Sequence, residues 1–206
     1  MARLTAVRLG IVVGLVALVV AAIGASTASA SGSLLGLNND CGTISQPFAQ
    51  FGDYNNYTFG TNGGLESGAT GWSLSGAAGV VRGNESYYVH SSSDKSSLQL
   101  SSGSTALTPN LCMGTTSKVV RFFLRSGNGG RVRVEVVLRN ALGQVLGIVQ
   151  ISDLSPGASW QPGPAILNLD SLLGLIGVSS IQLKFTELSG SAQIDDVYVD
   201  PWAWRG

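Results

Sequence analysis

Charged residues and histidine are scarce in this sequence. Charged side chains make up 12% of the chain, with basic and acidic residues balanced at 12 each, and His90 is the sole histidine. General nucleic-acid or membrane-surface binders need concentrated positive charge, which this balance does not provide. A Ser-His-Asp hydrolase would have to use His90, but the chain has no G-x-S-x-G turn. It also has no phosphate-binding loop and no H-E-x-x-H motif, so we expect a protein that is not an enzyme.

Long apolar runs are absent after the first thirty residues, and the run found there is short. Arg3 and Arg8 precede an uncharged apolar run over residues 9–23, and small residues lead to Ala28-Ser29-Ala30. This order predicts a Sec-type signal peptide over residues 1–30. The alternative is an uncleaved anchor, but the run is shorter than the roughly 20 residues that span a bilayer. We expect a secreted protein, extracellular or in the cell envelope, with no membrane span after cleavage.

Cysteine is limited to Cys41 and Cys112. There is no C-x-x-C motif, and a single histidine cannot complete a zinc site with two cysteines. An even pair in an exported chain predicts one structural disulfide. On the chain-entropy model, closing a loop of this length stabilises the fold by roughly 4 kcal/mol.

No long amphipathic helix is apparent, whereas two-residue alternation recurs. Residues 118–125 place Val120, Phe122 and Leu124 on one face, and residues 131–139 alternate more strictly. The Gly- and Asn-rich gap between these two segments predicts that they form a hairpin. Further strands are expected in the segments 72–81, 86–90, 97–101, 146–151, 160–169, 181–186 and 193–199. Eight or more short strands joined by loops predict an all-β, antiparallel sandwich or jelly roll.

The domain organisation follows from where these signals begin. Residues 31–60 are predicted to form an extension packed on a domain of residues 61–206, with short strands at 47–51 and 57–59. The Leu- and Gly-rich segment 169–178 fits either a single helical turn or an apolar loop.

Motifs near the two ends of the main domain resemble those of a known fold family. The N-G-G-L-E run at residues 62–66 with Gly71-Trp72 resembles the opening of galactose-binding-like jelly rolls, which include CenC-type carbohydrate-binding modules. Residues 193–199, with their D-D-V core, resemble the last strand of that fold, and Trp160 resembles the start of a late strand. The resemblance implies a jelly roll over residues 60–200. The chain also resembles a recurrent group of exported bacterial proteins in residues 56–58, 83–85, 121–123 and 194–201.

The resemblance also implies a structural calcium ion. In the modules concerned, the early glutamate and the last-strand aspartate often ligate calcium, and the matching residues here are Glu66 and Asp195. Alternation places Asp195 on the face of Val197 and Val199, where an unpaired carboxylate is costly, and calcium prefers oxygen ligands. The alternative is that these carboxylates pair with an arginine or cap backbone N–H groups.

The outward face of the predicted hairpin is the candidate ligand surface. An aromatic ring among guanidinium groups suits an acidic or hydroxyl-rich glycan, whereas the alternative is a solvated face whose arginines cover apolar surface. Aromatic rings that could stack on sugars include Tyr54, Tyr57, Tyr87, Trp160, Trp202 and Trp204. The predicted ligand-binding residues are Arg121, Phe123, Arg131, Arg133, Glu135 and Tyr88, with Arg125 close to them.

These features together predict a secreted, non-catalytic binding module for an extracellular polysaccharide, with no nucleic-acid partner. The alternative is a structural or adhesive cell-envelope protein that uses the same fold to contact another protein.

Overall fold

The fold is described from a computed structural model of the chain, which covers residues 41–112, 119–165 and 177–200. The predicted signal peptide over residues 1–30, most of the segment 169–178, and both Trp202 and Trp204 lie outside these described residues. All of the described residues belong to one structural unit.

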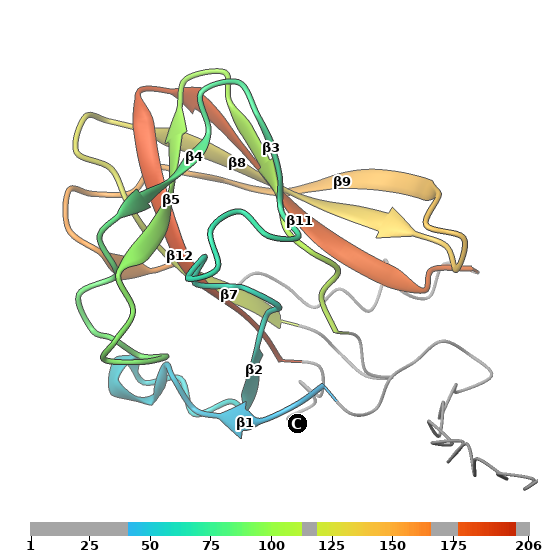
Figure 1. The fold of residues 1–206 in the computed structure, drawn as a ribbon, viewed down its shortest axis with the longest axis horizontal. Helices are drawn as coiled ribbons and strands as arrows, with labels where there is room; N and C mark the ends of the chain where they lie inside the picture. Colours follow the sequence, from blue (N-terminus) through green and yellow to red (C-terminus); the bar gives the residue numbers. More distant parts are fainter. Residues whose placement is uncertain (1–40, 113–118, 166–176, 201–206) are drawn as a thin grey trace, which may run out of the picture. The chain divides into compact units, whose positions relative to one another are not determined.

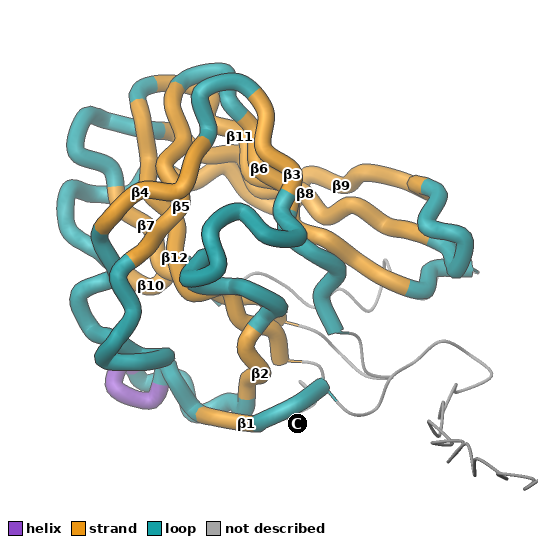
Figure 2. Tube along the Cα trace, in the orientation of Figure 1, coloured by secondary structure: helices purple, strands orange, loops and turns teal. Residues whose placement is uncertain are grey.

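Two antiparallel sheets account for nearly all regular structure in the described residues. One sheet runs β1-β2-β12-β5-β4, with β7 on the other side of β12 and β10 beside β7. The other runs β3-β6-β11-β8-β9 (Figure 1). A single 3-10 turn, η1, is the helical element of the described chain (Figure 2). No described helix has the length and apolar character needed to cross a membrane.

The first sheet, called here the β12 sheet, contains β1 (Ile44–Ser45), β2 (Tyr57–Phe59), β4 (Gly79–Arg82), β5 (Ser96–Ser101), β7 (Val119–Arg125), β10 (Gln161–Pro162) and β12 (Ser191–Asp200). The second, the β11 sheet, contains β3 (Ser73–Ser75), β6 (Thr105–Leu107), β8 (Arg131–Arg139), β9 (Val145–Leu154) and β11 (Ser180–Ser189). Helix η1 spans Ala49–Phe51.

The main core lies between the two sheets and is built from alternate residues of each long strand. The buried side chains include Leu98, Leu100, Val120, Phe122, Leu124, Val132, Val134, Val136, Leu138, Ile181, Leu183 and Phe185. Each such burial stabilises the fold by about 1.5–3 kcal/mol. The predicted alternation is correct in these strands, and the predicted all-β jelly-roll sandwich is confirmed.

The predicted β7–β8 hairpin is wrong. Strand β7 pairs with β12 and β10, whereas β8 pairs with β11 and β9, so the two strands belong to different sheets. The link between them is hydrogen-bonded to the first residue of β12. Ser126 Oγ donates to Ser191 O at 2.7 Å and accepts from Gly130 N at 2.6 Å. A Cβ at Gly130 would lie 2.4 Å from Ser191 O, so a side chain would block this crossing.

The N-terminal segment adds β1 and β2 to the β12 sheet. A strand was expected over residues 47–51, but the chain turns there, because Phe51 N donates to Phe48 O and Gly52 closes the turn with φ of 80°. The turn buries Phe48 against the outer face of the sheet. Cys41 and Cys112 form the predicted disulfide, with their Cα atoms 5.6 Å apart.

Phe48 belongs to a second, smaller core on the outer face of the β12 sheet. We call this group the outer aromatic cluster: Phe48, Tyr57, Phe123, Trp160 and Tyr198. Its rings pack edge-to-face or stacked, with centroids 5.1 to 6.5 Å apart for the pairs of Phe48 and Tyr198 within the cluster, a geometry worth about 0.5–1.5 kcal/mol per pair beyond burial. This cluster covers one end of the outer face.

Candidate functional site

The last strand contains an irregularity that positions several polar groups. Strand β12 pairs with β5 over residues 191–194 and with β2 at Tyr198 and Val199, and its register with β7 shifts between Asp195 and Tyr198. Asp196 lies inside this bulge with φ of 47°, in the left-handed region that is unusual for a residue with a side chain. The bulge leaves a gap between β2 and β5 along β12.

The N-G-G turn predicted to be a family motif fills this gap. Gly60 N donates to Val197 O at 2.9 Å, and Val197 N donates to Gly63 O at 3.2 Å. A Cβ at Gly63 would lie 2.7 Å from Val197 O, and one at Gly64 would lie 2.8 Å from Asp196 Oδ1. Glycine is therefore needed at both positions because the loop touches the bulge.

Four acidic residues are buried around the bulge and are called here the carboxylate cluster: Glu85, Asp94, Asp195 and Asp196. Backbone N–H groups satisfy some of them. Asp195 accepts from Glu85 N at 2.8 Å and from Asp196 N at 2.9 Å, and Glu85 accepts from Val89 N at 2.7 Å.

Asp196 differs from the other members of the cluster. Its side chain is fully buried, and neither carboxylate oxygen has a hydrogen-bond partner of standard geometry among the described residues, although the backbone N–H of His90 points toward it and partly offsets the rise in its pKa. Burial, reinforced by the Glu85 and Asp94 carboxylates, raises the pKa of Asp196 to about 8. Burial and the adjacent Asp196 charge raise the pKa of Asp195 in the same way. Such a site favours either protonation or a bound cation, because an unpaired buried carboxylate is costly.

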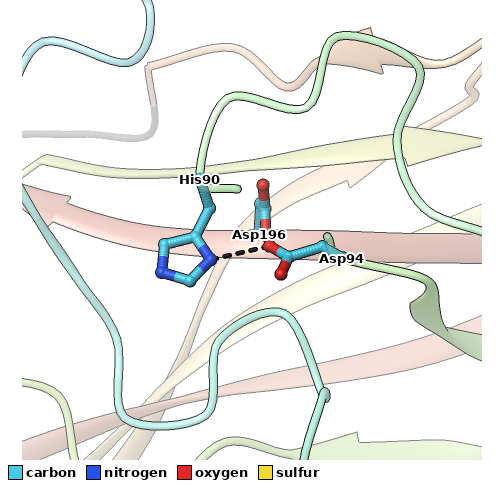
Figure 3. A group of neighbouring side chains, drawn as sticks. All are labelled: His90, Asp94 and Asp196. Carbon is cyan, nitrogen blue, oxygen red and sulfur yellow. Dashed lines mark hydrogen bonds and ion pairs between the residues drawn. The ribbon is translucent and has the colours of Figure 1, made fainter. Parts of the chain in front are cut away.

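His90 completes a candidate metal-binding group with Asp94 and Asp196 (Figure 3). One ligand atom from each of the three lies within 4.8 Å of the others. His90 Nδ1 lies 2.7 Å from Asp94 Oδ2, and the imidazole stacks on the Phe59 ring at a centroid distance of 3.8 Å. Two carboxylates, of which Asp196 has oxygens without a hydrogen-bond partner, and one oriented imidazole are a suitable donor set for a divalent cation.

The predicted calcium ligands occupy different roles from those expected. Glu66 is exposed, and its Oε1 accepts from Lys95 N at 2.8 Å and Ser96 N at 2.7 Å. Asp195 also accepts from backbone N–H groups, so both carboxylates make the contacts that the capping alternative describes. The candidate ligand that the sequence did not indicate is Asp196, because strict alternation placed it on the opposite face from Asp195, and the bulge removes that alternation.

A second candidate site is a pocket on the open end of the outer face of the β12 sheet. Three side chains from neighbouring strands form a hydrogen-bonded row: Arg125 Nε donates to Gln193 Oε1 at 2.6 Å, and Gln193 Nε2 donates to Gln99 Oε1 at 3.0 Å. The Arg125 guanidinium lies over the Trp160 ring, 5.0 Å from its centroid. The row borders a cavity of about 300 Å³, which we call the polar pocket. Its lining includes Gln99, Arg125, Ser126, Ala158, Ser191 and Gln193.

Two predicted ligand residues, Arg121 and Phe123, share this outer face but are covered. Phe123 is fully buried in the outer aromatic cluster. Arg121 forms an ion pair with Asp53, donates to Gly163 O at 3.0 Å, and lies 4.4 Å from the centroid of the Phe48 ring. Both residues hold the N-terminal segment in place, so the prediction that they face solvent is wrong.

The predicted ligand residues of β8 lie on the opposite sheet of the sandwich from Arg121 and Phe123. Arg131 and Arg133 pair with Asp153 at 2.9 and 3.0 Å, and Glu135 pairs with Lys184 at 2.8 Å. They are on the outer face of the β11 sheet, and the structure does not bring them together with Arg121 and Phe123. Their pairing fits the alternative of a solvated, charged face.

The predicted aromatic candidates also separate. Tyr57 and Trp160 are buried, while Tyr54, Tyr87 and Tyr88 are exposed. A strand was expected at Tyr88, but the chain bends there and Tyr88 has φ of 50°. The bend forms because the Glu85 carboxylate accepts hydrogen bonds from Tyr87 N and Val89 N. The Tyr87 hydroxyl donates to Trp160 O at 3.2 Å, and Trp160 is the residue whose ring stacks on the Arg125 guanidinium.

Comparison with known proteins assigns no family to the chain. Neither a protein-family model nor a curated protein matches the chain. Among solved structures, the chain is similar to the CBM22-1 xylan-binding domain of Xyn10C from Paenibacillus barcinonensis, at 14% identity, over 66% of this chain and 90% of that one, with a TM-score of 0.46. It is also similar to TmCBM61 in complex with β-1,4-galactotriose, at 16% identity, over 68% and 94%, with a TM-score of 0.45.

A third similar structure is the K2 cleaved adhesin domain of Lys-gingipain, at 10% identity, over 66% of this chain and 96% of that one, with a TM-score of 0.43. At these identities the likeness concerns the fold alone. The chain's own sheet topology makes it a two-layer antiparallel sandwich.

Proposed function

We propose that this protein is a secreted, non-catalytic module that binds a glycan in the polar pocket. The observation that carries the proposal is the row of Gln99, Gln193 and Arg125 beside a cavity of about 300 Å³. That volume is at the lower end of the range for small-molecule sites, about 300–1,000 Å³. It suits one or a few sugar units.

The chemistry of the pocket matches a hydroxylated ligand. Gln193 keeps one N–H and one lone pair, so it can donate to or accept from a sugar hydroxyl, whereas Gln99 can only accept because its Nε2 donates to Leu100 O and Ala192 O. Their mutual hydrogen bonds fix both side chains before a ligand arrives, which lowers the entropy lost on binding. No acidic residue is among the described residues that line the pocket, which supports binding rather than acid–base hydrolysis there.

Affinity electrophoresis in gels that contain soluble polysaccharides, after a glycan-array screen, tests this proposal. Gln193→Ala should weaken binding about tenfold, because it removes contacts worth about 1–1.5 kcal/mol and releases Arg125. Gln150→Ala is the matched control, since Gln150 is an exposed glutamine on β9 in the opposite sheet. Unchanged retention of Gln193→Ala, or an array with no bound glycan, would contradict the proposal.

We also propose that the carboxylate cluster holds a structural calcium ion, with Asp196 as a ligand and Asp94 beside it. The orphaned oxygens of Asp196 and the raised pKa values around it support a missing positive charge. A bound calcium would supply that charge and link the N-G-G turn to β12. Isothermal titration of chelated protein with CaCl₂ should show saturable uptake. Zinc is titrated in parallel because the His90 imidazole favours transition metals. Absence of calcium uptake would exclude the proposal.

A specific observation favours the adhesive alternative. Strand β9 is an edge strand, and its exposed apolar side chains include Val145, Leu146 and Ile148, next to the 83% exposed Leu142 in the preceding turn. Exposed apolar edges are typical of protein–protein contacts. A blank glycan array together with a protein partner whose capture is lost in Ile148→Lys would select this alternative.

A further inference from the structure

We propose that the glycan bound in the polar pocket carries a carboxylate group, as uronic acids do, and that Arg125 binds this group. The inference rests on the proposed function, because it names the chemical class of ligand for the same pocket. The evidence for this inference is the set of contacts that the Arg125 guanidinium makes in the pocket.

Arg125 has no carboxylate partner among the described residues. Its Nε donates to the neutral Gln193 amide at 2.6 Å, and its guanidinium stacks on Trp160. Three other arginines of the described strands pair with carboxylates: Arg121 with Asp53, and both Arg131 and Arg133 with Asp153. Arg139 resembles Arg125 in donating to a neutral amide, that of Gln182. Arg125 differs from Arg139 because it lines the polar pocket and its guanidinium stacks on Trp160. Arg125 is thus a half-buried positive charge without an acidic partner among the described residues.

The pocket itself supplies no negative charge to Arg125. Its described lining consists of amide, hydroxyl and small side chains around the single guanidinium. A neutral sugar would leave that charge uncompensated, whereas an anionic group would be attracted more strongly than in bulk water, since the site is partly shielded from solvent. The favoured ligand therefore contributes one negative charge.

The geometry of the guanidinium selects a planar anion. With Nε already bonded to Gln193, the two terminal nitrogens remain to donate in the guanidinium plane, and two parallel N–H donors match the two oxygens of a carboxylate. Stacking on Trp160 and the bond to Gln193 hold the plane in one orientation. Gln99 Nε2 donates to Leu100 O and Ala192 O, so the groups left for ring hydroxyls are the second N–H of Gln193 and the remaining lone pairs of the two amide oxygens. These groups suit the hydroxyls of a sugar that carries the carboxylate.

The test compares polymers that differ at the carboxylate alone. Binding of the whole protein to polygalacturonate, to the same polymer after reduction of its carboxyl groups, and to a sulfated galactan is measured by isothermal titration. We expect the acidic polymer to bind at least about tenfold more tightly than the reduced one, the difference expected for a charge-assisted hydrogen-bonded pair. Equal binding of the reduced polymer overturns the inference and leaves the proposed function intact. Equal or tighter binding of the sulfated galactan overturns the assignment to a carboxylate.

Variants connect this preference to Arg125. Arg125→Gln should abolish the difference between the acidic and reduced polymers, while Arg139→Gln, which removes an equal charge from the opposite sheet, should preserve it. A retained preference in Arg125→Gln overturns the inference. If Arg125→Gln does not fold, as judged by its thermal melt, Arg125→Lys decides: it keeps the charge but loses the planar pair of donors, so affinity for polygalacturonate should fall several-fold. Full affinity in Arg125→Lys overturns the proposed geometry. If no polymer, acidic, sulfated or neutral, binds the wild type, the proposed function fails as well.

Discussion

At the scale of single residues, Asp195 and Asp196 are adjacent aspartates with opposite surroundings. Asp195 accepts two backbone N–H groups, whereas the oxygens of Asp196 are buried without a described partner. We predict that Asp196→Asn abolishes the rise in melting temperature that CaCl₂ produces in the wild type, because it removes the ligand charge. Thermal melts with EDTA and with excess CaCl₂ provide the measurement.

Asp195→Asn is the matched variant for this comparison. It replaces one acceptor oxygen by an NH₂ group that faces a backbone N–H. We therefore expect the free energy of unfolding to fall by about 1–3 kcal/mol, with or without calcium. A calcium response that survives in Asp196→Asn but disappears in Asp195→Asn would reverse the assignment of the ligand.

The glycines of the N-G-G turn give a second prediction at this scale. In Gly64→Ala, the new methyl group would lie 2.8 Å from Asp196 Oδ1 and 3.3 Å from Phe59 Cζ. Overpacking of this kind destabilises by about 1–3 kcal/mol, to be measured by urea unfolding. Gly79→Ala on β4 is the control, since its Cβ meets nothing within 4 Å. Equal stability of the two variants would contradict the argument.

Sequence reasoning recognised the motifs around this site but not their roles. The N-G-G-L-E run and the D-D-V run were correctly identified as features of one fold, and they meet at the bulge. The burial of Asp196 beside Asp195 was not predicted, because a bulge inserts a residue without any signal in the alternation of polar and apolar residues. Gln99 and Gln193 were not predicted as ligand residues, because only the spatial order of the strands shows that they are neighbours.

At the scale of elements, the N-terminal segment is held by a buried polar group as well as by rings. Asp53 accepts from the Tyr57 hydroxyl at 2.7 Å and from Asn55 N at 3.1 Å, and it pairs with Arg121. Burial raises the pKa of Asp53, but these hydrogen bonds and the Arg121 charge outweigh burial, and the pKa is lowered overall. The ionised carboxylate is therefore the form that stabilises the fold.

The pH dependence of this contribution follows from the lowered pKa. The stabilisation from Asp53 is fully present above the ordinary carboxyl pKa of 3.8. It is lost as the pH falls through the lower pKa that Asp53 has in the folded protein. Asp53→Asn should reduce the free energy of unfolding by about 1–3 kcal/mol at pH 7, and the deficit should shrink as the pH is lowered below 3.8. Urea titrations at several pH values measure it. A deficit independent of pH would indicate lost packing instead.

The strand assignments show where pattern reasoning succeeds and where it fails for an element. Alternation identified the inward faces of β5, β7, β8 and β11 because a half-buried strand has a period of two. It failed for the partner of β7, since a short Gly-rich link looks the same whether it joins paired strands or crosses between sheets. The turn at residues 85–90 was mistaken for a strand because the capping role of Glu85 depends on its burial, which the sequence does not display.

At the scale of the whole molecule, one covalent bond joins the first described residue to the body. The disulfide between Cys41 and Cys112 closes a loop across a sequence separation of 71. Replacing both cysteines by serine should lower the free energy of unfolding by roughly 4 kcal/mol on the chain-entropy model. Urea unfolding of the double variant and of the oxidised wild type provides the comparison. Equal stability would mean that packing alone fixes the N-terminal segment.

The architecture as a whole was the most predictable feature of the chain. Short alternating segments, turn-rich links and the absence of an amphipathic helix exclude most other folds, so a two-layer sandwich remains. The location of the open surface was not predictable in the same way. It depends on Phe48, which no pattern marks as a residue that covers the face of a distant strand.

The outer aromatic cluster has a consequence for how long molecules are recognised. Because the rings around Phe48 and Phe123 occupy one end of the outer face of the β12 sheet, a polymer bound as we propose would contact this face at the polar pocket and would find no continuous track along the described strands. Binding strength should therefore depend on the sugars at one short stretch and level off after a few units, so that longer chains gain by offering more sites for separate copies.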